Sequence, residues 1–161
     1  MQPKQVPIDP DVDQHDGGQR TEPRGGTCSH LLAVAVGGML GAVARHAVGE
    51  ALPHQPGEYP WSTFIINVSG CLLIGVLMVS ITEVWTAPQL VRPLLGVGVL
   101  GGYTTFSTYV LDAQQAVATG HAATGLLSLA VTPVSGLLAV YVGIIVTRLV
   151  AGSRLRRKDH R

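Results

Sequence analysis

Residues 96–109 read Gly-Val-Gly-Val-Leu-Gly-Gly-Tyr-Thr-Thr-Phe-Ser-Thr-Tyr, inside a stretch without charge over residues 93–111. Adjacent glycines loosen a helix, and an unwound turn would leave carbonyl groups without helical partners. Irregular backbone at membrane depth is tolerated only where protein or water covers it, and free carbonyls there can bind cations. The same residues fit equally well a glycine-rich packing seam whose hydroxyls bond to carbonyls of their own helix.

The composition of the whole chain is that of a membrane protein. Apolar residues make up 47% of its 161 residues and charged residues 13%, against about 25% charged in an average soluble protein. A soluble core of this size would need a charged surface, which the middle of this chain lacks. Between positions 30 and 148 the charged residues are Arg45, Glu50, Glu58, Glu83, Arg92 and Asp112.

Four apolar segments are each long enough to cross a hydrocarbon core of about 30 Å. The first contains Arg45, which can extend its charge to the interface. We therefore predict an all-α membrane protein with four transmembrane helices and a break in the third. The segments cover residues 31–49, 61–82, 93–111 and 122–147.

The chain divides into three parts. We expect a disordered tail over residues 1–29, which is rich in Pro, Asp, Gly and Gln. The transmembrane domain is expected over residues 30–150, and a basic tail over residues 151–161. A basic tail is compatible with nucleic-acid binding, but beside an apolar helix it favours an anchor on anionic membrane lipid. We therefore expect lipid and not nucleic acid as its partner.

Basic residues are distributed very unevenly across the expected membrane. Of the 11 Lys and Arg residues, all except Arg45 fall before the first apolar segment, after the fourth one (from Arg148 on) or in the link between the second and third segments. The positive-inside rule therefore predicts a multi-pass protein of the plasma membrane with both termini in the cytoplasm.

Uncharged polar residues interrupt the apolar segments. Asn67 lies within the second segment, where a carboxamide is costly unless it finds a partner; it forms either an interhelical hydrogen bond or part of a polar path. Ser128, Thr132 and Ser135 share one face of the fourth segment, next to Pro133. These hydroxyls either extend a polar track or bond to carbonyls of their own helix.

Several classes of function are disfavoured. No acidic residue lies in the middle of a predicted helix, which argues against a proton-coupled exporter. The sequence shows no phosphate loop, metal-ligand cluster or nucleophile–base pair, so we expect no enzyme. A coupled transporter and a structural subunit with glycines for packing stay as alternatives to a channel.

Three motifs occur in order on the predicted helices: Gly37-Gly-Met-Leu-Gly41-Ala-Val-Ala-Arg45, Asn67-Val-Ser-Gly70 and Gly101-Gly-Tyr-Thr-Thr-Phe-Ser-Thr-Tyr109. Together they resemble the Fluc/CrcB family of fluoride ion channels over residues 36–146. The resemblance implies a fluoride-selective channel that lowers cytoplasmic fluoride by passive export. It further implies an antiparallel dimer of four-helix subunits with two fluoride pathways.

The resemblance also implies particular site residues. A structural sodium ion at the dimer centre would be held by the backbone carbonyls of Gly101 and Thr104. Arg45 matches a motif arginine with a structural or anion-attracting role. The fluoride pathway would contain Asn67, Phe106, Ser107, Thr108 and Tyr109, and by a looser alignment Ser128 and Thr132.

Two features depart from the family pattern. Tyr109 stands where the family usually has a second phenylalanine; its ring edge is still positive and its hydroxyl adds a donor. The uneven basic residues favour insertion in one orientation, whereas an antiparallel homodimer needs both. The bias therefore predicts an antiparallel heterodimer with an oppositely oriented homologue.

Overall fold

The structure, a computed structural model, describes residues 24–85 and 87–158, with side chains over 27–85 and 87–152. The predicted N-terminal tail lies outside the described residues as far as position 23. The described part is helical throughout apart from its links and contains no strand. Its elements are α1 (Arg24–Ala51), α2 (Trp61–Val79), η1 (Ser80–Val84), η2 (Arg92–Leu100), α3 (Gly101–Tyr103), α4 (Ser107–Ala118) and α5 (Ala122–Lys158).

These elements form four spans that are long and apolar enough to cross a membrane: Thr27–Ala51, Trp61–Val84, Arg92–Ala118 and Ala122–Gly152. Their surfaces carry many exposed large apolar side chains, such as Leu32 at 66% and Leu137 at 73%. Side chains of this kind would be unfavourable in water and are suited to lipid or to another apolar surface. The predicted all-α membrane fold with four spans is confirmed.

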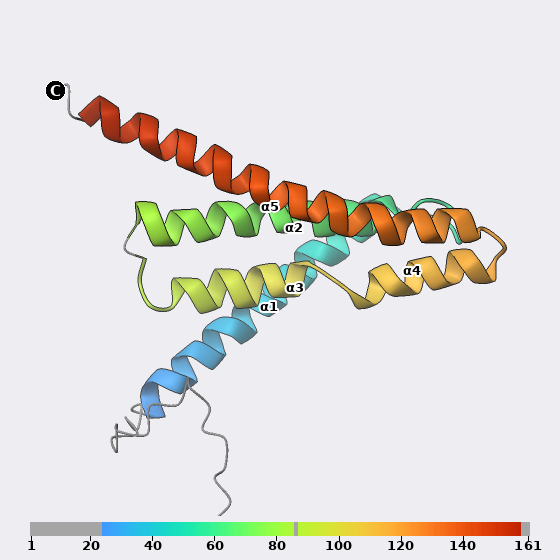
Figure 1. The fold of residues 1–161 in the computed structure, drawn as a ribbon. Helices are drawn as coiled ribbons and strands as arrows, with labels where there is room; N and C mark the ends of the chain where they lie inside the picture. Colours follow the sequence, from blue (N-terminus) through green and yellow to red (C-terminus); the bar gives the residue numbers. More distant parts are fainter. Residues whose placement is uncertain (1–23, 86, 159–161) are drawn as a thin grey trace, which may run out of the picture.

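The spans pack as two pairs joined through the third span. α2 lies along α5, whereas α1 crosses η2 and α3 obliquely (Figure 1). α4 extends beyond the interruption of the third span and packs on α5. The start of α1 and the C-terminal end of α5 lie at the same end of the bundle, together with the link between η1 and η2 (Figure 1).

Glycines let the two helices of each pair approach closely. A Cβ placed on Gly98 would lie 2.9 Å from the Gly37 Cα, and one on Gly102 would lie 2.9 Å from the Gly38 Cα. Between α2 and α5, a Cβ on Gly143 would lie 3.2 Å from the Val76 nitrogen. Side chains at these positions would push the helices apart, so the first-helix motif forms a helix contact of the small-residue type.

The helices extend beyond the apolar segments. α1 begins at Arg24 and α5 ends at Lys158, within the residues that composition assigns to tails. α4 continues to Ala118, so Asp112 lies inside a helix and not in a link. The chain then reverses within three residues because Gly120 adopts φ 84°, the left-handed conformation that suits a glycine after a helix end. Hydropathy locates the membrane-crossing part but not the ends of a helix that continues into water.

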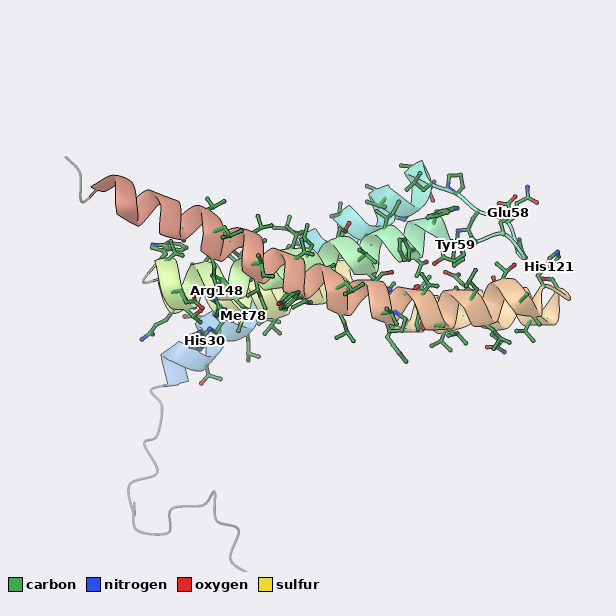
Figure 2. All side chains as sticks on the ribbon, turned by 45° about the horizontal axis from the view of Figure 1, so that its top comes forward. His30, Glu58, Tyr59, Met78, His121 and Arg148 are labelled. Atoms are coloured by element: carbon green, nitrogen blue, oxygen red, sulfur yellow. The ribbon has the colours of Figure 1, made fainter. Side chains whose placement is uncertain are left out.

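An ion pair joins the second and fourth spans at the end of the bundle where α1 begins and α5 ends. Arg148 donates from Nε and Nη2 to the Glu83 carboxylate, with the shortest distance 2.6 Å. Arg148 and His30 lie at this end of the bundle, whereas Glu58, Tyr59 and His121 lie at the opposite end (Figure 2). The pair is exposed, so solvent screens the attraction and the pair contributes little to the free energy of unfolding.

Candidate functional site

The third span is interrupted where its glycine-rich half meets its hydroxyl-rich half. Thr104, the residue after α3, has an extended backbone with φ −75° and ψ 158°, and α4 begins only at Ser107. Asn67 of α2 binds this irregular segment with both ends of its carboxamide. Its Nδ2 donates to the Thr105 carbonyl and its Oδ1 accepts from the Thr105 N–H, each at 2.9 Å.

This arrangement diverts two N–H groups from helical hydrogen bonding and so releases the carbonyls that they would bind in a continuous helix. In a continuous helix, Gly101 would accept from the N–H of Thr105, and Thr104 from the N–H of Thr108. Here the Thr105 N–H donates to Asn67 and the Thr108 N–H donates to the Thr105 hydroxyl at 3.2 Å. The released carbonyls belong to the two residues that the resemblance assigns to sodium.

Arg45 approaches one of these carbonyls. Its Nη1 donates to the Thr104 oxygen at 3.2 Å, across the contact between α1 and the third span. The guanidinium group is half-buried and supplies positive charge next to the interruption. Arg45 therefore joins α1 to the interrupted segment.

Hydroxyl groups gather at the C-terminal side of the interruption, where α4 begins. The buried Thr105 hydroxyl donates to the Thr108 hydroxyl at 3.0 Å and lies 3.4 Å from that of Ser107. Ser107 and Thr108 are exposed at the start of α4. Thr105, which the sequence analysis quotes only within a motif, is thus the central residue of the cluster. Tandem threonines after the glycine pair are the only sequence signal that points to it.

A groove of about 450 Å³ opens beside the interruption. Its polar lining includes Asn67, Thr104, Thr105 and Thr132, and its apolar lining includes Leu137. Phe106 is 78% exposed at this groove, whereas Tyr109 is buried. Their ring centroids lie 5.8 Å apart with an interplanar angle of 55°, so the two rings form a tilted pair.

A second cavity, of about 390 Å³, lies towards the opposite end of the bundle from the start of α1. Thr105 lines both cavities and therefore separates them. Many of the side chains that line the second cavity are hydrophilic: Thr108 together with Arg45, His46, Glu50, His54, Ser62 and Thr63. Hydrophilic side chains thus continue from the interruption towards one end of the molecule.

A hydrogen-bonded cluster adjoins this second cavity and is missed by the sequence analysis. The Thr63 hydroxyl donates to the Asp112 carboxylate at 2.6 Å, and the His54 Nε2 lies 3.7 Å from the same carboxylate. The Ser62 hydroxyl lies 3.3 Å from the His54 Nδ1. The cluster joins the link after α1 to α2 and α4. Asp112 is found only through tertiary packing, because composition places it in a polar link.

The two predicted residues of the fourth span have different surroundings. Thr132 is buried and lines the groove with Asn67 and Phe106. Ser128 lies one turn earlier, is 1% exposed and donates to the Gly125 carbonyl at 2.8 Å. Ser128 therefore matches the second interpretation of these hydroxyls, in which they bond to carbonyls of their own helix. It does not line the groove.

Within the described residues, no group of three or more histidine, cysteine, aspartate or glutamate side chains could hold a metal ion. The interruption instead offers backbone carbonyl oxygens, among them those of Gly101 and Thr104. Such oxygens are suitable for a hard monovalent cation.

Comparison with known proteins identifies relatives over the whole membrane domain. A family model described as "CrcB-like protein, Camphor Resistance (CrcB)" matches residues 32–144. Proteins named "Fluoride-specific ion channel" align with a large part of the chain. FluC 2 of Nocardia farcinica is 44% identical over 126 residues, which cover 78% of this chain and 90% of the relative. FluC 1 of Streptomyces coelicolor is 50% identical over 120 residues, 74% of this chain and 78% of the relative.

A third relative is more similar over a shorter range. FluC 2 of Streptomyces avermitilis is 54% identical over 102 residues, which cover 63% of this chain and 65% of the relative. The chain thus spans a little less than two thirds of that relative.

Proposed function

The chain belongs to the CrcB-like protein family, an ion-channel family and not an enzyme family, and from this premise we propose that it is a subunit of a fluoride-selective channel. The channel would lower cytoplasmic fluoride by passive export. The observation that carries this function is the interruption of the third span, where Asn67 and Thr105 line the same groove as the exposed Phe106 ring and Thr108 lines the cavity beyond Thr105.

The chemistry of these donors is suited to fluoride. The ion is small and strongly hydrated, so a pathway must replace water with hydrogen-bond donors. The Asn67 amide has two N–H groups, of which the bond to Thr105 uses one, and the hydroxyls of Ser107 and Thr108 can rotate to donate. The positive edge of Phe106 adds a weak attraction. Fully charged ligands would hold the ion too tightly for it to leave.

The two cavities suggest the course of the pathway. An anion from the second cavity would pass Arg45 and Thr108, cross beside Thr105, and reach the groove that Asn67 and Phe106 line. Asn67, Phe106 and Tyr109 line the groove and Thr108 lines the second cavity, whereas Ser107 is among the lining residues of neither. Thr132 lies at the groove end of the course, and Ser128 lies outside it.

A second subunit would complete the groove. Phe106 and Leu137 expose 78% and 73% of their surfaces at its margin, and lipid tails offer no donors to an ion there. We propose an antiparallel dimer, with the partner covering this face. The basic residues favour one orientation for this chain, so the partner would be an oppositely oriented homologue. Differently numbered channel proteins, FluC 2 and FluC 3, occur together in Streptomyces avermitilis and are consistent with paired subunits.

The interruption also suits a structural sodium ion. The released carbonyls of Gly101 and Thr104 are the ligands we propose, repeated from the partner subunit. A carbonyl oxygen has two lone pairs, so Thr104 can accept from Arg45 and still face a cation. When bound, sodium would supply fixed positive potential and hold the two subunits together. The side chains of Asn67 and Thr105 keep the carbonyls released, because they take the N–H groups that would otherwise bind them.

The test is fluoride efflux from liposomes, followed with a fluoride electrode and with chloride as the control anion. We expect fluoride-selective efflux, either from this chain alone or after reconstitution with an oppositely biased homologue. Folded protein that passes no fluoride in either form would contradict the proposed function. Efflux from this chain alone, with its termini on both faces, would contradict the heterodimer and leave the channel intact.

A further inference from the structure

Pro133 leaves one carbonyl of α5 without its helical partner. It lies inside the helix, and the regular partner of its missing N–H is the carbonyl of Leu129, four residues earlier. The proline ring also pushes that carbonyl away from the helix axis. A carbonyl released in this way within a membrane must find another donor.

The hydroxyl of Tyr109 supplies this donor. It donates to the Leu129 oxygen at 2.6 Å, from α4 to α5, across 20 positions of the sequence. The Tyr109 side chain is 8% exposed, and both Tyr109 and Pro133 line the groove with Phe106. The hydroxyl and the missing N–H are therefore parts of one local arrangement.

We propose that Tyr109 and Pro133 work as a coupled pair in which the phenolic hydroxyl replaces the N–H that residue 133 lacks. The hydroxyl holds α4 against the proline-bent part of α5 and so sets the groove beside Phe106. Tyr109 is then a positioning residue, and its hydroxyl is not a fluoride ligand, because its proton is engaged by Leu129. This inference rests on the proposed fluoride pathway and explains why a tyrosine can stand at this position.

If the two residues are coupled, the effect of replacing Tyr109 must depend on whether Pro133 is present. Tyr109→Phe removes the donor and leaves the Leu129 carbonyl unpartnered, so α5 shifts and fluoride flux falls. Pro133→Ala restores a backbone N–H to Leu129 and removes the need for the hydroxyl. The phenyl ring left by Y109F can then pack in the same buried site, and flux should return.

The experiment measures fluoride efflux for the wild type, Y109F, P133A and the double variant, in the assembly that conducts. Flux is divided by the amount of correctly assembled dimer, and melting temperatures are recorded for the same samples. An unpartnered buried carbonyl is costly, so we expect Y109F to lower flux per dimer about tenfold. In the P133A background we expect the same change to alter flux less than about twofold.

Tyr141→Phe is the matched control. Tyr141 lies on α5, the helix of Pro133, and is 62% exposed, so the same loss of a hydroxyl should leave flux unchanged in both backgrounds.

The other outcomes contradict the pair in different ways. An equal loss of flux from Y109F in both backgrounds would make the hydroxyl a fluoride ligand. A lower melting temperature for Y109F with unchanged flux per dimer would make its role only structural. A wild type without fluoride flux would instead overturn the proposed function, and with it the place of the pair on a pathway.

Discussion

At the scale of single residues, Asn67 determines the local structure of the interruption. Its carboxamide binds the N–H and the carbonyl of Thr105, which are the groups that lose their helical partners there. The position alone is compatible either with an interhelical bond or with a pathway donor. The structure shows the interhelical bond, and the unused amide N–H leaves room for the second role.

Asn67→Asp separates these two roles. The carboxylate keeps an acceptor for the Thr105 N–H but loses the donor and adds a negative charge beside the pathway. We expect assembly to persist and fluoride efflux to fall by at least about 100-fold, an effect of about 2.7 kcal/mol. Gln114→Glu is the control, because it makes the same chemical change at an exposed position of α4.

The N67D result is read from efflux and size-exclusion chromatography together. Loss of the dimer would show that Asn67 serves assembly. Normal efflux with an intact dimer would remove Asn67 from the pathway.

At the scale of elements, hydropathy predicts the four spans because membrane-crossing segments need nearly continuous apolar residues. The glycine and threonine run at residues 101–105 indicates where the third span becomes irregular. Tertiary partners are not accessible in this way: nothing near Tyr109 in the sequence identifies Leu129, and Asp112 acquires Thr63 and His54 only when α4 packs beside α2. Ser128 shows the same limit, since an identical residue pattern fits a polar track or a bond within one helix.

Two neighbouring glycines of α1 give an element-scale prediction. A Cβ on Gly37 would lie 2.9 Å from the Gly98 Cα, whereas one on Gly38 would meet nothing within 4 Å. Gly37→Ala should therefore separate α1 from η2 and lower the melting temperature markedly. Gly38→Ala should be neutral or stabilising by up to about 1 kcal/mol, because alanine favours helix. Equal effects of the two substitutions in thermal unfolding would contradict this packing.

At the scale of the whole molecule, the described ends of α1 and α5 share one end of the bundle, as an even number of spans requires (Figure 1). The basic residues predict that this end faces the cytoplasm in every copy. An antiparallel homodimer would instead place half of the copies in each orientation.

Orientation can be measured with a membrane-impermeant thiol reagent. Cys28 is exposed near the start of α1 and Cys71 lies within α2, so Cys71→Ser leaves a single reporter. We expect Cys28 to be unreactive in intact cells and reactive after permeabilisation. Glu58→Cys, added to a variant lacking both native cysteines, should show the opposite pattern. Labelling of half the Cys28 in intact cells would contradict the single orientation.

The central claim is that uncharged donors at an interrupted helix conduct fluoride passively. The reversal potential of the current across a planar bilayer, with fluoride on one side and chloride on the other, tests it most directly. A passive, selective pathway predicts a reversal potential that follows the fluoride gradient and does not respond to a proton or sodium gradient. A reversal potential that follows chloride, or that shifts with either cation gradient, would contradict the account.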